Sequence, residues 1–120
     1  MNNNRIDYIL YCLSKSKFRS GFYLKDKDKE YVKNKGIDTI KSHACDFIKM
    51  RLAPLNIPND GKQTPMKGHP VFIAQHATGT CCRNCLYKWH KIEKNKVLSD
   101  VEQAYVVNII MTWINRQISK

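Results

Sequence analysis

Apolar residues recur every three or four positions near both ends of the chain, which is the spacing of one face of an α-helix. At the N-terminus this pattern predicts a helix over residues 4–15. Near the C-terminus, Ser99 and Glu102 form a capping box, in which each side chain accepts a hydrogen bond from the other residue's backbone N–H, so a long helix begins there. The residues expected on its buried face are Val101, Tyr105, Val106, Ile109, Ile110, Trp113, Ile114 and Ile118.

Two more helices are expected in the first half of the chain. A short, highly charged helix covers residues 28–35 and ends at Gly36, because glycine best tolerates a left-handed helix end. An amphipathic helix covers residues 36–52 and ends before Pro54, because proline cannot continue a helix. Its apolar stripe consists of Ile37, Ile40, Ala44, Phe47, Ile48 and Leu52.

The periodicity disappears between Leu52 and Thr80, where prolines and glycines interrupt the chain. Within this stretch, His69 and Pro70 suit the start of a helix of one or two turns, and a short strand is the alternative. A long irregular segment in a small domain is usually functional or held by something other than regular secondary structure, and a bound metal is one candidate. The pattern predicts a mainly α, single-domain helical fold over residues 1–120, with a long irregular central segment that a metal would fasten.

Composition places the chain among globular cytoplasmic proteins. The 120 residues are enough for one domain with its own core, and no apolar run approaches the roughly 20 residues of a membrane span. The N-terminal MNNNRIDYIL lacks the basic start and apolar stretch of a secretory signal, so we expect a cytoplasmic protein without a membrane partner. In that reducing compartment, five cysteines are ligands, reactive groups or core residues rather than disulfides.

Charge suggests a class of partner. The chain has 21 Lys and Arg against 10 Asp and Glu, a net charge of +11, and a field of that sign attracts phosphate polyanions and acidic surfaces. Nucleic acid and acidic proteins are therefore the candidate partners. The alternative is a compositional bias of lysine-rich usage, with the charges on solvated faces. One stretch resembles a basic patch, and it contains Arg83, Lys88, Lys91, Lys94 and Lys96.

The candidate chemistry lies in residues 68–90, which hold three of the five cysteines and three of the four histidines. Cys82 and Cys85 have Cys-x-x-Cys spacing, and His76 and His90 flank them. Two thiolates separated by two residues bind one ion from a tight turn, and imidazoles from neighbouring segments complete a tetrahedron, so the spacing predicts zinc. The reserve ligands are Cys81, His69 and His43.

In the zinc interpretation Arg83 and Asn84 occupy the turn, where asparagine tolerates a left-handed backbone. Two alternatives to zinc remain for these cysteines. If residues 80–90 instead form one continuous helix, Cys82 and Cys85 share the core-facing side with Leu86 and Trp89 and are plain buried thiols. A redox or nucleophilic thiol is the second alternative, because Cys81 and Cys82 lie beside the positive Arg83.

These observations lead to two classes of function. The first is a small basic zinc-binding protein with a structural site and a nucleic-acid or acidic protein partner. The second is an enzyme, either a metal-dependent hydrolase with Asp60 or a histidine as general base, or a thiol-based redox enzyme. The first is favoured because no acid or base is placed beside the ligands. Cys12 is expected in the core, and Gln63, Thr64 and Gln75 are expected to line a pocket or to satisfy buried backbone groups.

The same residues carry a resemblance that covers nearly the whole chain. Its segments are SKFRSGFYL, GIDTIKSHACDFIKMRLAP, NDGKQTPMKGHPVFIAQHATGTCCRNCLYKWH and VEQAYVVNIIMTWI. On these segments the chain resembles a family of short bacterial cytosolic proteins that is classed only as a domain of unknown function. The resemblance implies no activity and no catalytic residue.

Overall fold

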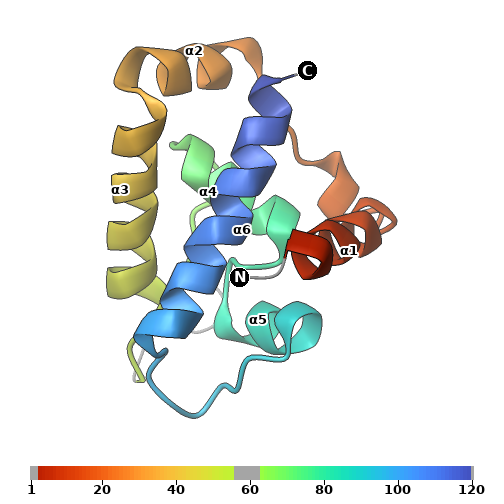
Figure 1. The fold of residues 1–120 in the computed structure, drawn as a ribbon, viewed down its shortest axis with the longest axis vertical. Coiled ribbons are helices and arrows are strands. Elements are labelled where there is room, and N and C mark those ends of the chain that lie inside the picture. The colour runs from red at the N-terminus through yellow and green to blue at the C-terminus, as the bar shows by residue number, and fades with distance from the viewer. Residues whose placement is uncertain (1–2, 56–62, 120) are drawn as a thin grey trace.

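The computed structural model describes residues 3–55 and 63–119, and Figure 1 shows how the helices of this part are arranged. None of these residues forms a strand, so the prediction of a mainly α fold is confirmed. No helix in the described ranges is long and apolar enough to cross a membrane. The elements are α1 (Asn3–Ser14), the 3-10 turn η1 (Arg19–Gly21), α2 (Asp26–Lys35), α3 (Ile37–Phe47), the π-helical turn η2 (Ile48–Leu52), α4 (Pro70–Thr78), α5 (Arg83–His90) and α6 (Asp100–Ile118).

Helix α4 lies at the centre of the molecule, behind α6 and between α1 and α3 in the view of Figure 1. Every residue of α4 except Ile73 is buried, as expected for a helix surrounded by others. The core forms where α4 meets α6 and the helical segment of α3 and η2. Residues that are 0% exposed there are Ile40, Ala44, Ile48, Leu52, Val71, Ala74, Val106, Ile109, Ile110 and Ile114.

Helices α1 and α2 lie within two residues of their predicted bounds. Helix α2 begins earlier than predicted, at Asp26, because the Asp28 carboxylate accepts a hydrogen bond from the backbone N–H of Lys25 at 3.1 Å. Gly36 ends α2 as predicted. Its φ is +89°, and its N–H donates to the Val32 carbonyl at 2.9 Å.

The helix predicted over residues 36–52 changes character near its end. It is α-helical to Phe47, and then the Ala53 N–H donates to the Ile48 carbonyl at 2.9 Å, which closes a wider π turn. The predicted apolar stripe faces the core except at Ile37, which is 38% exposed. The wide turn buries Leu52 and Ala53, whose carbonyl groups then need hydrogen-bond donors.

The capping box that begins α6 is confirmed. The Ser99 N–H donates to the Glu102 carboxylate at 2.9 Å, and the Glu102 N–H donates to the Ser99 hydroxyl at 3.1 Å. The predicted buried face holds from Tyr105 to Ile114. It is wrong for Val101, which is 75% exposed because the first turn of α6 extends beyond the core.

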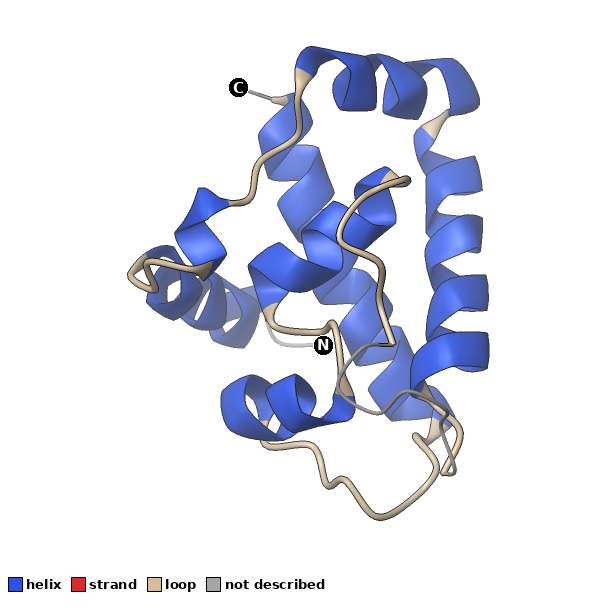
Figure 2. Cartoon of the chain, turned by 180° about the vertical axis from the view of Figure 1, so that it is seen from behind, coloured by secondary structure: helices blue, strands red, loops and turns tan. Residues whose placement is uncertain are grey.

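Helix α4 occupies much of the segment that was expected to be irregular. Pro70 is its first residue, so the helical interpretation of the His69–Pro70 pair is confirmed and the strand is wrong. Residues 63–69 run beside α4 (Figure 2). The Thr64 hydroxyl donates to the Cys81 carbonyl at 2.7 Å, and Gln75 donates to the Thr64 oxygen at 3.2 Å and to the Thr80 carbonyl at 3.0 Å. Thr64 and Gln75 therefore satisfy buried polar groups, as expected.

Arg83 holds together the end of η2 and the connection between α5 and α6. Its side chain is 3% exposed and donates to the carbonyl groups of Leu52 at 3.2 Å and Ala53 at 3.5 Å. It also donates to the carbonyl groups of Glu93 and Lys96, each at 2.7 Å. One guanidinium thus joins the end of η2 to the connection between α5 and α6. The prediction that Arg83 belongs to an exposed basic patch is wrong, because these carbonyl groups hold it inside.

We predict that Gly79→Ala destabilises the fold. Gly79 ends α4 with φ +69°, and a Cβ there would lie 2.7 Å from Trp89 Cδ1 and 2.9 Å from Trp89 Cγ. Steric overlap and left-handed strain together should lower the free energy of unfolding by about 2 kcal/mol, measured by urea denaturation. Gly21→Ala is the matched control, because its Cβ would meet no atom within 4 Å. Equal stability of the two variants would contradict this account.

Candidate metal centre

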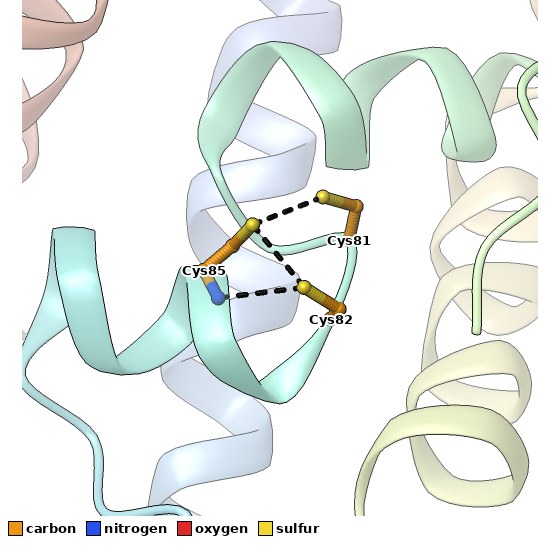
Figure 3. A group of neighbouring side chains, drawn as sticks. All are labelled: Cys81, Cys82 and Cys85. Atoms are coloured by element: carbon orange, nitrogen blue, oxygen red, sulfur yellow. Dashed lines mark hydrogen bonds between the residues drawn. The ribbon is translucent and has the colours of Figure 1, made fainter. Parts of the chain in front are cut away.

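The sulfur atoms of Cys81, Cys82 and Cys85 meet at the junction of α4 and α5. Figure 3 shows Cys81 and Cys82 on the connecting segment and Cys85 on α5, with all three side chains pointing toward one another. The three sulfurs lie within 4.8 Å of one another. The Cys85 sulfur is 3.5 Å from that of Cys81 and 3.2 Å from that of Cys82. Cys81 and Cys82 are buried, and Cys85 is half-buried.

The short connection between the two helices brings these sulfurs together. Gly79 turns the chain out of α4 in the left-handed conformation, and the Thr80 N–H returns to the Gln75 carbonyl at 2.9 Å. The Thr64 hydroxyl holds the Cys81 carbonyl. The backbone of the connection is thus fixed from both sides, and Cys81 and Cys82 are presented to the first turn of α5.

The Cys-x-x-Cys pair lies at a helix start rather than on a tight turn. Cys82 is the N-cap of α5, and its sulfur accepts the Cys85 backbone N–H at 3.4 Å. Arg83 and Asn84 are the first residues of the helix, and neither has a positive φ. The prediction of a left-handed turn at Asn84 is wrong, because the Cys82 side chain caps a regular helix and no sharp turn is needed.

Arg19 of η1 places a positive charge against the cluster. Its guanidinium donates to the Cys85 sulfur at 3.0 Å, to the Cys81 sulfur at 3.4 Å and to the His76 carbonyl at 2.7 Å, and the residue is 8% exposed. Sequence reasoning missed this residue, which lies more than sixty positions before the cysteines. Nothing in the local sequence singles out Arg19, because its neighbours Phe18 and Ser20 are exposed and give no buried pattern.

These contacts favour one thiolate and two thiols. Hydrogen bonds from the Cys81 thiol and then the Cys82 thiol lower the pKa of Cys85, and the Arg19 guanidinium lowers it further against the opposing effect of burial. Hydrogen bonds with Cys82 and Cys85, followed by burial, raise the pKa of Cys81. A thiolate is both the nucleophilic and the metal-binding form of cysteine, so Cys85 is prepared for either chemistry.

His76, predicted as a ligand, lies beside the cluster without joining the three sulfurs. Its ring stacks on Phe22 at 5.4 Å between ring centres, and Nε2 is 3.1 Å from the Pro65 carbonyl oxygen. Burial lowers its pKa. The link to the cluster runs through Arg19, which bonds the His76 carbonyl and two of the sulfurs.

His90, the other predicted ligand, is 2% exposed and has partners at both ring nitrogens. Nε2 is 2.8 Å from the Thr78 carbonyl oxygen, which accepts only, so Nε2 donates. Nδ1 therefore accepts the Tyr105 hydroxyl hydrogen at 2.7 Å. Burial lowers the pKa of His90 to about 4. A neutral imidazole in this position joins α5 to α6 and to the end of α4.

His69 and His43, the reserve ligands, pair with each other away from the sulfurs. His69 caps α4, where Nδ1 accepts the Val71 N–H at 3.0 Å, and its Nε2 lies 3.0 Å from His43 Nδ1. Since Nδ1 of His69 is the acceptor, Nε2 carries the hydrogen and donates to His43. Burial and then the neighbouring His43 lower the pKa of His69 to about 4. The rings packed on His69 are Tyr31, Phe47 and Phe72.

The remaining predicted groups lie apart from this centre. Asp60, the candidate general base, falls outside the described residues. In the described part of the chain, the group of side chains that could hold a metal consists of cysteines and contains no carboxylate. Cys12 is half-buried rather than a core residue, because it lies on the flank of α1, and Cys45 is exposed on α3.

Comparison with known proteins gives a family without an assigned role. Residues 7–115 match the family described as Domain of unknown function (DUF4186). No solved structure matches the chain. The match covers all three cysteines and Arg19, but it supplies no chemistry for them.

We predict that the His90 pairing makes the fold acid-sensitive. The unfolded chain takes up a proton at His90 below about pH 6.5, whereas the folded chain takes it up only near pH 4. Because the unfolded state binds more protons in this window, the free energy of unfolding falls as the pH falls. From pH 7 to pH 5 this residue alone should contribute a loss of about 2 kcal/mol, measured by urea denaturation. His90→Gln should lose less stability over the same interval, and an unchanged pH dependence would contradict the assignment.

Proposed function

The chain belongs to the DUF4186 family of unknown function, and we propose that it is a zinc-binding protein whose ligands include Cys81, Cys82 and Cys85. The observation that carries the proposal is the convergence of the three sulfurs. Thiolates are soft ligands that favour zinc over magnesium or calcium. The protein would act in a reducing compartment such as the cytosol, where thiols remain available.

The distances between the sulfurs fit a tetrahedral zinc ion. With zinc–sulfur bonds of about 2.3 Å, tetrahedral geometry separates two sulfur ligands by roughly 3.8 Å. The Cys85 sulfur lies 3.5 Å and 3.2 Å from its two neighbours, so it needs to move outward by about half an ångström. Side-chain rotation alone supplies such a shift, and the backbone of the connection is unchanged.

Charge balance also supports zinc at this position. Three thiolates around one divalent ion leave a single negative charge in a mostly buried site, which is unfavourable without a partner. Arg19 supplies the compensating positive charge through its contacts with Cys81 and Cys85. Zinc binding displaces the protons of Cys81 and Cys82, so the affinity for zinc should fall as the pH falls.

Three cysteines leave one position of the tetrahedron for another ligand. Of the predicted histidines we assign His76, because Arg19 links its backbone to the cluster and, among the described residues, its ring bonds only to the backbone at Thr64 and Pro65, contacts that would break if the ring turned. His90 and His69 are left out of the proposed set. Both ring nitrogens of each are engaged elsewhere, and a ligand role would break the cap of α4 or the contact between α5 and α6.

We predict about one equivalent of zinc in protein purified without a histidine tag, measured by elemental analysis. Cys82→Ser and Cys85→Ser should each reduce the content below about half an equivalent, because a two-sulfur site binds zinc far more weakly. Cys45→Ser is the matched control, since Cys45 is an exposed cysteine on α3, and it should retain the parent content. His76→Ala tests the fourth ligand in the same assay. Less than half an equivalent in the parent protein would refute the proposal.

We also predict that a chelator lowers the melting temperature without removing the helices at 25 °C. The core of α3, α4 and α6 and the Arg83 contacts do not involve the sulfurs, so they keep the fold together when zinc leaves. Loss of a bound ligand lowers stability by mass action. Circular dichroism with and without chelator measures both effects. Complete unfolding by the chelator would contradict the claim that the core and the Arg83 contacts hold the fold without zinc.

A thiol-based redox function is the second candidate, favoured by the 3.2 Å separation of the Cys82 and Cys85 sulfurs and by the contact of Cys85 with Arg19. With hydrogen peroxide as oxidant, the two cysteines would lose two electrons and two protons to form one disulfide, and the peroxide would become two water molecules. Mass spectrometry of peroxide-treated, metal-free protein detects that bond. Oxidation of exposed Cys45 in preference to the cluster would exclude this function.

A further inference from the structure

A cavity separate from the cysteines opens at the other end of α4. Its volume is about 760 Å³, within the range of pockets that hold small ligands. It lies between the segment from Gly21 to Tyr31 and the segment from Met66 to Ile73. Because α4 rises about 1.5 Å per residue, its nine residues place this cavity and the sulfurs roughly 13 Å apart along the helix axis.

The inner wall of the cavity is aromatic and uncharged. Tyr31 and His69 pack edge to face at 5.4 Å, and Pro70 and Ile73 of α4 continue this wall. His69 is held neutral because Nδ1 accepts the Val71 N–H and Nε2 donates to His43. Such a wall suits the face of a planar ring better than it suits a charged group.

The rim of the cavity is positively charged. Lys25, Lys27 and Lys67 line it and are exposed, against the single carboxylate of Asp28. That carboxylate already accepts the Lys25 backbone N–H at 3.1 Å, which uses part of its hydrogen-bonding capacity at the start of α2. The lysines are therefore available to a negatively charged group at the mouth of the cavity.

Tyr23 adds an exposed aromatic ring to the same rim. It lines the cavity and is 59% exposed, although burial of a tyrosine ring is favourable. An exposed aromatic ring beside lysines is the arrangement that proteins use for nucleobases, which stack on the ring while the cations contact the phosphates.

We propose that this cavity binds a nucleotide, with the base against Tyr23, Tyr31 and His69 and the phosphate at Lys27 and Lys67. The division between an uncharged aromatic wall and a cationic rim matches the two halves of a nucleotide. The nucleotide is either free or part of a single strand, and the chemistry of recognition is the same for both. None of the three cysteines lines the cavity, and the two sites approach each other at Phe22, which lines the cavity and stacks on His76.

Two fluorescent probes test the site: a ribose-labelled ADP and a labelled oligothymidylate of about ten nucleotides. Fluorescence anisotropy should show saturable binding of at least one probe, weakened by raising the salt from about 50 to 200 mM. The double variant Lys27→Gln/Lys67→Gln should weaken binding about ten-fold, and Tyr23→Ala should weaken it by a similar factor. Zinc content should be unchanged in both variants.

Lys41→Gln/Lys49→Gln is the matched control, because it removes the same charge from exposed positions on α3 and η2. It should change the affinity less than two-fold or so. Tight binding of the ADP probe assigns a free nucleotide, and binding of the oligonucleotide alone assigns a single strand. Absence of binding by both probes below about 1 mM, or an equal loss in the control, overturns the proposal.

Discussion

The crowding of three thiol groups at the junction of α4 and α5 is the constraint on which the functional account depends. Sulfurs this close are stable as thiols that share hydrogen bonds around one thiolate, or as thiolates around a cation. Arg19 donates to the Cys85 sulfur in the first case, and in the proposed zinc site it would offset the remaining negative charge. The same guanidinium would then serve both states.

Two buried arginines, Arg83 and Arg19, hold the irregular parts of the chain in place through hydrogen bonds. Arg83 donates to the carbonyl groups of Leu52 and Ala53 at the π turn and to those of Glu93 and Lys96 in the connection to α6. Arg19 connects η1 to the end of α4 and to the sulfurs. A metal was one candidate for holding the central segment in place. In the described residues, hydrogen bonds from Arg83, Thr64 and Gln75 hold parts of that segment.

The helices were largely predictable because their determinants are local. Ser99, Glu102, Gly36 and the His69–Pro70 pair act through groups a few residues away, and each begins or ends a helix as expected. The cluster was predictable in part, since Cys82 and Cys85 are close in the sequence. Arg19 was not predictable, because its partners are distant in the chain and their proximity depends on how η1 packs against α4.

The histidines show why spacing alone is insufficient for choosing ligands. His90 has suitable spacing from Cys85, but α5 turns its ring toward Tyr105 and Thr78. His69 is the N-cap of α4 and His76 lies in its last turn, so their rings lie at opposite ends of this helix. The orientation of a side chain on a helix thus decides its chemistry, and that orientation follows from tertiary packing.

X-ray absorption at the zinc edge would identify the atoms that bind the ion. The spectrum of the zinc-loaded protein should show three sulfur ligands at about 2.3 Å and one nitrogen or oxygen ligand at about 2.0–2.1 Å. A first shell with one sulfur or none, or one made mainly of nitrogen and oxygen, would contradict a centre built on Cys81, Cys82 and Cys85.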